Sequence, residues 1–277
     1  MTGLDALFFG AHPDDVELTS GGLAALLAAH GHRVGIADLT RGEAASRGTV
    51  EERAREAEVA ERELGVERRE NLELPDLGID RSSRAQLAAV VACLRRHRPG
   101  LVVAPDHEDP HPDHVEASHL IARACYVSGL ARFGGGAAGA VPEDGPARAG
   151  ERFRPARLLF ALYRSGARPQ LVVDVGRVWE RRMAAIAAHR SQLGVPPAGT
   201  GSGADARTDS GAGTYLTRPD FLAEVEARAR HWGALIGARH GEAYRARGPI
   251  AVADARVLLA DAGLGHAADP AAQGRAS

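Results

Sequence analysis

Lysine is absent from this chain of 277 residues, in which all 34 basic residues are arginines. Schiff-base catalysis, pyridoxal phosphate anchoring and P-loop phosphate binding each require a lysine, so the sequence excludes these kinds of site. Cysteine is nearly absent as well. Only Cys93 and Cys125 occur, each within an apolar helical pattern, and we expect two buried free thiols rather than a disulfide.

Long apolar runs and a strong net charge are also lacking. The formal net charge is −2, which gives no bias toward nucleic-acid or membrane partners. No stretch of 18 apolar residues and no basic leader segment are present, so we expect no signal peptide and a cytoplasmic protein. The apolar content of 44% is sufficient for a full core.

Strand-like and helix-like segments alternate along the chain. Short apolar runs predict strands at 4–10, 33–40, 72–75, 101–104, 157–163 and 171–175. Helical periodicity and capping residues predict helices at 20–30, 50–64, 82–98, 113–130, 178–193 and 220–239. This alternation is typical of βαβ units and predicts an α/β fold: a parallel sheet with helices on both faces.

The domain organisation that we expect is simple. Residues 1–265 are expected to form a single domain, interrupted by flexible Gly- and Pro-rich loops near 134–152 and 194–213. Residues 266–277 are expected to be a disordered tail.

Two clusters of histidine and aspartate follow predicted strands. Residues 11–17 read AHPDDVE directly after the first strand, and residues 111–114 read HPDH shortly after the strand at 101–104. In open α/β sheets, functional residues lie on loops at the carboxyl ends of the strands. We therefore expect both clusters, and the loop at 40–49, to meet at one edge of the sheet and form the active site there.

The two clusters contain the donors of a hydrolytic zinc site. His12 and Asp15 lie three positions apart in one turn and can chelate a single ion, and His114 at the start of a helix can complete the site. Catalytic zinc takes three such protein ligands and keeps a fourth position for water.

The remaining side chains of the clusters suit acid–base chemistry. Asp14 lies between the first two donors and can point at the bound water, as a general base requires. His111 is left over, and Asp113 lies two positions later. A carboxylate that is hydrogen-bonded to an imidazole holds its tautomer and favours its cation.

Other readings of these residues remain open. Either cluster alone could be an ordinary turn before a helix, with proline at an early position and aspartate as a cap. Together, each after a strand, they favour the metal site. His107 is the strongest competing ligand. The other histidines that we considered are expected on the surface or on helix faces: His30, His32, His97, His119, His231 and His240.

These residues resemble the LmbE-like, or PIG-L, family of zinc-dependent N-acetylglucosaminyl deacetylases, whose hallmark is the motif pair His-Pro-Asp-Asp and His-x-x-His. The similarity covers about residues 4–252 apart from the two loops. Further segments resemble the bacillithiol-biosynthesis branch of the family: Thr40-Arg41-Gly42-Glu43, Arg47-Gly48-Thr49, Arg53, Asn71-Leu72, Leu74-Pro75-Asp76, Ser191-Gln192, EARAR at 226–230, Gly237 and Gly241-Glu242-Ala243.

The resemblance implies a Rossmann-like fold and one Zn²⁺ per chain, with Fe²⁺ as the alternative metal, held by His12, Asp15 and His114. It also implies a homo-oligomer, commonly a hexamer in this branch. The implied partner is a small amino-sugar substrate, and the usual substrate of the branch is N-acetylglucosaminyl malate, which is cleaved to glucosaminyl malate and acetate.

Catalytic roles follow from the same resemblance. Asp14 becomes the general base, and His111 the charge-stabilising imidazole with Asp113 as its orienting partner. Either Asp14 or His111 protonates the departing amine. Arg53 would hold substrate hydroxyls or the acyl side.

One position departs from the branch pattern. An arginine is common immediately before the second motif, whereas this chain has Pro110. An anionic aglycone would then need another arginine, and Arg41 and Arg47, on the loop after the second strand, are the candidates. A guanidinium can bind a carboxylate through two parallel hydrogen bonds.

The alternative functions fall into two classes. Within the family, the substrate could be a mycothiol-type conjugate, a chitooligosaccharide or an antibiotic sugar. Outside it, the chain could be a metal-binding or nucleotide-binding Rossmann domain without turnover. Against the second class, no Gly-x-Gly-x-x-Gly follows the first strand, and Asp14 is redundant for metal storage alone.

Overall fold

Seven strands form one sheet in the order β3-β2-β1-β4-β5-β7-β6. The structure is a computed structural model, and it describes residues 3–133, 151–164, 166–195 and 213–250. The tail expected at 266–277 and most of the two loops expected near 134–152 and 194–213 lie outside the described residues.

Apolar runs build the centre of the sheet. Strands β1 (Ala6–Gly10) and β2 (Val34–Thr40) are buried at every residue, and β4 (Leu101–Pro105) at all but its first. Such runs are typical of parallel strands that are covered on both faces. The sheet continues in parallel to β3 (Arg68–Leu74) beside β2 and to β5 (Arg157–Ala161) beside β4.

The far edge of the sheet corrects the expectation of a wholly parallel sheet. Strand β7 (Gly241–Ala246) pairs antiparallel with both β5 and β6 (Leu171–Asp174). The sequence did not reveal β7, because its buried residues include Glu242, which interrupts any apolar run. The two oxygens of this carboxylate accept hydrogen bonds from the backbone N–H groups of Gly22 and Leu23, each at 2.7 Å.

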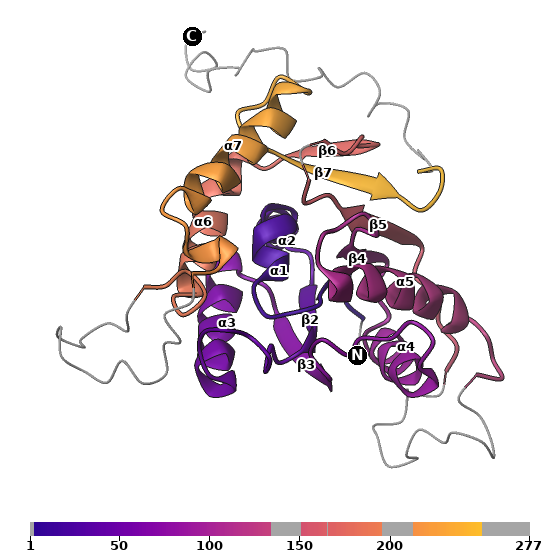
Figure 1. The fold of residues 1–277 in the computed structure, drawn as a ribbon. Helices are drawn as coiled ribbons and strands as arrows, with labels where there is room; N and C mark the ends of the chain where they lie inside the picture. Colours follow the sequence, from indigo (N-terminus) through magenta and orange to yellow (C-terminus); the bar gives the residue numbers. More distant parts are fainter. Residues whose placement is uncertain (1–2, 134–150, 165, 196–212, 251–277) are drawn as a thin grey trace, which may run out of the picture.

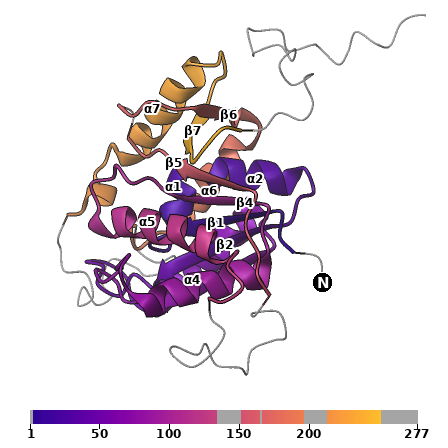
Figure 2. The same cartoon turned by 90° about the vertical axis from the view of Figure 1, so that its right-hand side faces the viewer.

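Helices cover both faces of the sheet, as expected, and Figures 1 and 2 show the two layers. Side chains alternate along β1: Leu7 and Phe9 join the core against α4 and α5, whereas Ala6 and Phe8 join the core against α2, α3 and α6. The bounds are α2 Gly21–Ala29, α3 Val50–Leu64, α4 Arg84–His97, α5 Pro112–Val127 and α6 Trp179–Ala188.

Helix α3 shows how local sequence sets an element's ends. Thr49 accepts a hydrogen bond from the backbone N–H of Glu52 as the N-cap, and Gly65 ends the helix in the left-handed conformation with φ 71°. These are the bounds that the sequence predicted. The short helix α1 (Asp15–Thr19) was not predicted, because it is only five residues long.

The remaining composition-based expectations concern thiols and membranes. Cys93 and Cys125 are buried free thiols, as expected. Among the helices of the described residues, none combines the length and the apolar character needed to cross a membrane.

Candidate metal centre

The strand order reverses between β1 and β4, the two strands that lead into the histidine–aspartate clusters. Ligands of open α/β sheets bind in the crevice at such a switch point. A cavity of about 650 Å³ lies there, and its walls include residues of both clusters. The fold therefore brings together the two segments that the sequence selected.

Three donor side chains converge on one point of this cavity. The carboxylate of Asp15 lies between two imidazoles: Oδ2 is 3.4 Å from Nδ1 of His12, and Oδ1 is 3.1 Å from Nε2 of His114. The centroids of the two rings are 5.6 Å apart. These atoms could bind one metal ion as an N, N, O set, which suits zinc or ferrous iron.

The opposite nitrogen of each imidazole faces a carboxylate. Nε2 of His12 lies 3.0 Å from Asp76 and 3.5 Å from Asp113, and Nδ1 of His114 lies 3.0 Å from Asp109. Metal-binding histidines usually donate their second N–H to a carboxylate in this way, which fixes the tautomer. The sequence analysis gave Asp76 and Asp109 no role. Asp76 belongs to the segment Leu74-Pro75-Asp76, which resembles the family branch, and Asp109 lies two positions before His111.

The electrostatics of the cluster fit a cation. Burial lowers the pKa of His12, but hydrogen bonds that its ring donates to Asp113, Asp15 and Asp76 outweigh burial and raise the pKa to about 12. Burial also lowers the pKa of His114, but the negative charge of Asp15 and a hydrogen bond donated to Asp109 outweigh burial and raise the pKa to about 10. A site that favours positive charge this strongly fits a divalent ion.

Asp14 occupies the N-cap position of α1 but does not cap the helix. Its side chain makes no capping hydrogen bond, and its backbone has φ 127°, a conformation that non-glycine residues rarely adopt. Strain of this kind concentrates at functional sites. The structure thus contradicts the reading of this motif as an ordinary capped turn and leaves the carboxylate at the cavity wall.

The protonation behaviour of Asp14 suits a general base. Burial raises its pKa to about 6, against the opposing charge of Arg53 and with the support of the nearby charge of Asp15. A carboxylate with a pKa near 6 is charged at neutral pH and accepts a proton more readily than an ordinary aspartate does.

Arg53 is buried at 3% exposure. Its Nη2 donates to the carbonyl of Pro13 at 2.7 Å and lies 3.4 Å from Oδ1 of Asp14, and its Nη1 donates to the carbonyl of Gly42 at 3.2 Å. Arg53 is therefore not a solvated charge on the surface of α3.

His111 is the N-cap of α5, and its Nδ1 accepts a hydrogen bond from the backbone N–H of Asp113 at 3.3 Å. Burial, together with the charges of His114 and His12, lowers its pKa. The lowered pKa opposes the imidazolium cation that the sequence predicted for His111. An Nδ1 that accepts a hydrogen bond leaves Nε2 to carry the proton of the neutral ring. We expected the carboxylate of Asp113 at this ring. Instead it accepts from the backbone N–H of Leu77 at 2.7 Å and faces His12.

Three other residues singled out by the sequence lie away from the donors. His107 pairs with Asp106 and Arg245 on its two ring nitrogens, at 3.3 and 2.9 Å, which removes it as the competing ligand. Arg47 donates to the carbonyl of Ser191 at 3.3 Å, and Arg41 is exposed. Among the described residues that line the cavity at the metal donors, neither arginine is present.

Known proteins that resemble this chain include deacetylases. The family model for PIG-L, GlcNAc-PI de-N-acetylase, matches residues 7–125. The 1D-myo-inositol 2-acetamido-2-deoxy-alpha-D-glucopyranoside deacetylase of Rhodococcus opacus (strain B4) is 27% identical over 84% of this chain and 98% of its own length.

Two solved structures have the same fold. The conserved protein TT1542 from Thermus thermophilus has a TM-score of 0.73 and 33% identity, over 90% of this chain and 97% of that chain. The N,N'-diacetylchitobiose deacetylase from Pyrococcus horikoshii has a TM-score of 0.68 and 23% identity, over 88% of this chain and 84% of that chain. At 23% identity the likeness shows the fold alone.

Proposed function

We propose that the chain is a metal-dependent hydrolase that removes the N-acetyl group from an N-acetylglucosaminyl conjugate. The proposal is supported by the match of residues 7–125 to the family model for PIG-L, GlcNAc-PI de-N-acetylase, and by the similarity to a curated deacetylase. The observation that carries this proposal is the convergence of His12, Asp15 and His114 beside Asp14. The carboxylate of Asp14 is not one of the three metal donors, and it makes no capping hydrogen bond to the helix.

A divalent metal on the three donors would polarise the acetamide carbonyl and lower the pKa of a water molecule. Asp14 takes the proton from the attacking water, a role to which its raised pKa and its place at the cavity wall are suited. Hydrolysis of the amide also requires a donor for the oxygen that becomes negatively charged. The Nε2–H of His111 can supply that hydrogen bond, since its Nδ1 is already held by the helix terminus.

The neutral state of His111 bears on the proton that the departing amine must receive. A neutral Nε2–H donor stabilises negative charge without giving up its proton, as an electrophilic imidazole does. Asp14, once protonated by the water, then returns that proton to the amine. This assigns both proton transfers to one carboxylate and leaves charge stabilisation to the imidazole.

Arg53 positions the base in this scheme. Its guanidinium ties the carbonyls on either side of the site, Pro13 and Gly42, and lies against Asp14. Because Arg53 also borders the cavity, it can contact the sugar hydroxyls as the family resemblance implies.

The aglycone of the substrate separates two proposals. Sequence resemblance suggested the bacillithiol branch and a malate conjugate. The curated relative is instead named for a myo-inositol conjugate, which is the mycothiol-type alternative, so the comparisons support the family without this branch. Both conjugates share the N-acetylglucosaminyl group that the site would cleave.

A metal-binding domain without turnover is the competing function. It would need the three donors but would have no use for Asp14 in a strained backbone conformation beside them. Acetate release distinguishes the two. We expect the zinc- or iron-loaded protein to release acetate from the inositol or the malate conjugate of N-acetylglucosamine. A loaded protein that released none from either would contradict the proposal.

A further inference from the structure

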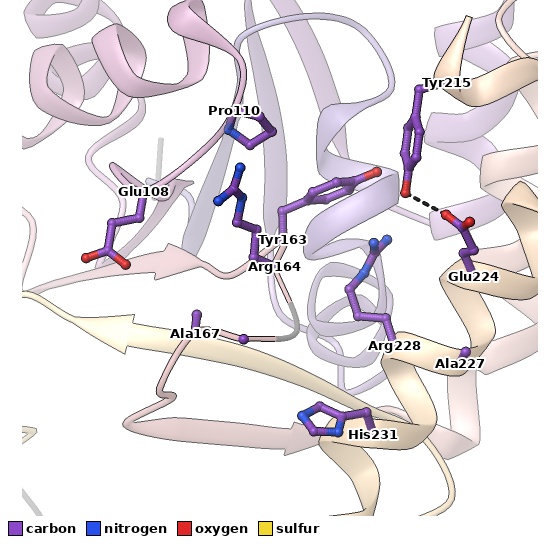
Figure 3. A pocket seen from close by; sticks show the side chains of 11 residues that line it. Glu108, Pro110, Tyr163, Arg164, Ala167, Tyr215, Glu224, Ala227, Arg228 and His231 are labelled. Carbon is purple, nitrogen blue, oxygen red and sulfur yellow. Dashed lines mark hydrogen bonds between the residues drawn. The ribbon is translucent and has the colours of Figure 1, made fainter.

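A second cavity, of about 950 Å³, adjoins the one at the metal donors. The two share Pro110, Tyr163 and Tyr215 in their walls, so the second cavity lies beside the proposed reaction centre. Figure 3 shows the second cavity, whose walls come from residues 163–164 and 166–167 on one side and from helix α7 (Phe221–Ala234) on the other. A conjugate whose acetamide lies at the donors would place its aglycone here.

Arg228 reaches into this second cavity from α7. Its guanidinium carbon lies 4.1 Å from the centre of the Tyr163 ring, and its Nη2 is buried without a hydrogen-bond partner among the described residues. Burying an N–H group without a partner costs free energy, which an acceptor on a ligand would recover. The stacking on Tyr163 fixes where that acceptor must lie.

Arg164 follows Tyr163 in the chain and supplies a second guanidinium. Its side chain is exposed, and in Figure 3 it extends toward Pro110. Within the described residues, the guanidinium of Arg164 makes no hydrogen bond and no ion pair. Arg164 and Arg228 thus border one space from two elements, with Tyr163 between them.

The acidic side chains of the second cavity do not neutralise these arginines. Glu224 accepts hydrogen bonds from Tyr215 at 2.7 Å and from Arg218 at 2.6 Å. Glu108 pairs with Arg245 at 3.1 Å. Both carboxylates therefore have cationic partners of their own, and the charge that remains in the cavity is positive.

We infer that the second cavity binds an anionic group of the aglycone, a carboxylate or a phosphate, between Arg164 and Arg228. The inference rests on the proposed deacetylase function, because it assumes that the sugar occupies the neighbouring cavity. Guanidinium groups bind such oxyanions through paired, charge-assisted hydrogen bonds. Pro110 then forms part of the wall, and the positive charge comes from Arg164 and Arg228.

The test uses two matched pairs of N-acetylglucosaminides. One pair is the malate glycoside and its dimethyl ester, and the other is the glycerol phosphate glycoside and the glycerol glycoside. We expect the wild-type enzyme to have a lower KM for the charged member of at least one pair. Arg164→Ala and Arg228→Ala should each raise that KM about 10-fold, the usual worth of a charge-assisted hydrogen bond, with kcat nearly unchanged. The pair that responds identifies carboxylate or phosphate.

Control variants separate binding from folding. Arg230→Ala removes an exposed arginine of α7 that is paired with Glu226. It should change neither the KM for the charged glycoside nor the KM for its neutral counterpart. Arg164→Ala removes an exposed side chain that has no partner in the described part of the chain, so it tests the inference even if Arg228→Ala fails to fold.

Several outcomes would overturn the inference. Equal KM values of the wild type for the charged and neutral members of both pairs would do so. An equal rise in KM for charged and neutral members in Arg164→Ala and Arg228→Ala would also do so. Loss of the preference in Arg41→Ala or Arg47→Ala alone would place the anion at the loop after β2 instead. If the wild type releases acetate from the inositol conjugate but from none of the four glycosides, this inference fails and the proposed function stands. If it releases acetate from neither the inositol conjugate nor any of the four glycosides, the proposed function fails and this inference falls with it.

Discussion

Arg53 and Asp14 lie in contact, with 3.4 Å between Nη2 and Oδ1, although they are 39 positions apart in the chain. Both side chains are almost wholly buried. The same Nη2 donates to the carbonyl of Pro13, so one guanidinium holds both the side chain of the proposed base and the backbone before it. This relationship explains how a strained aspartate can keep a single orientation.

Arg53→Ala should lower kcat for every N-acetylglucosaminide, whether charged or neutral, because Asp14 loses its anchor. The loss should be about 10²-fold, the scale that small misplacements of catalytic groups produce. Steady-state acetate release measures it. Arg55→Ala, an exposed neighbour on the same helix, should behave as wild type. A loss confined to anionic conjugates would assign Arg53 to aglycone binding instead.

Asp14→Asn should retain the metal and lose roughly 10²–10⁴-fold in kcat, because a positioned general base is removed while the three donors remain. Elemental analysis and acetate release on the same sample check both halves of this prediction. Near-normal turnover with full metal content would exclude Asp14 as the base.

His114→Ala should remove most of the bound metal, since one of three donors is lost. His107→Ala is the matched control: His107 lies seven positions earlier, on the connection that leads from β4 into α5, but pairs with Arg245 and Asp106. We expect that variant to keep full metal content in elemental analysis. The opposite pattern would exchange the roles of the two histidines.

Asp76→Asn and Asp109→Asn should weaken metal binding without abolishing it. Carboxylates behind metal-binding histidines are usually worth about 10- to 100-fold in affinity. Competition with a chelator measures the dissociation constant of each variant. Unchanged affinity in both would mean that these carboxylates do not orient the imidazoles.

The pH dependence of stability should reveal a second buried cluster, which is remote from the metal donors. Glu70 on β3 contacts His97, Cys93 and Arg96 at 2.8 to 2.9 Å. Burial opposes ionisation of Glu70, but the hydrogen bonds from His97 and Cys93 and the neighbouring charges prevail and lower its pKa from 4.5 to about 2.

A pKa that is lower in the folded state stabilises the protein above the unfolded value. This contribution is present above about pH 4.5 and disappears as the pH falls toward 2. Glu70→Gln should therefore lower the free energy of unfolding at pH 7 by about 2 kcal/mol, a figure reduced for partial exposure of the side chain. At pH 2.5, close to the folded-state pKa, most of the difference in urea midpoint between the variant and wild type should be lost. Glu67→Gln, at an exposed ion pair with Arg33, should show little effect at either pH.

Much of the fold could be predicted because its signals are local. The bounds of α3 follow from a threonine cap and a terminal glycine, and the central strands follow from short apolar runs. Strand β7 could not be predicted in this way. The buried charge of Glu242 is satisfied by groups that are distant in sequence, so no local pattern records it.

The candidate site could also be predicted only in part from the sequence. The motifs selected His12, Asp14, Asp15 and His114, and the fold gathers them at one sheet edge. The supporting contacts depend on three-dimensional packing that spacing does not encode. Asp113, for example, follows His111 by two positions, yet its carboxylate faces His12, because α5 begins between the two residues.

Glu242 also sets an order of events during synthesis. Its carboxylate accepts a hydrogen bond from the amino end of α2, which lies 220 positions earlier in the chain. The ribosome needs roughly 10 to 40 s to synthesise a segment of that length. Throughout this interval Glu242 is not available to the backbone N–H groups of Gly22 and Leu23. Strands β1 and β4, which lead into the two motifs, are therefore synthesised well before the contact that satisfies the amino end of α2 can form.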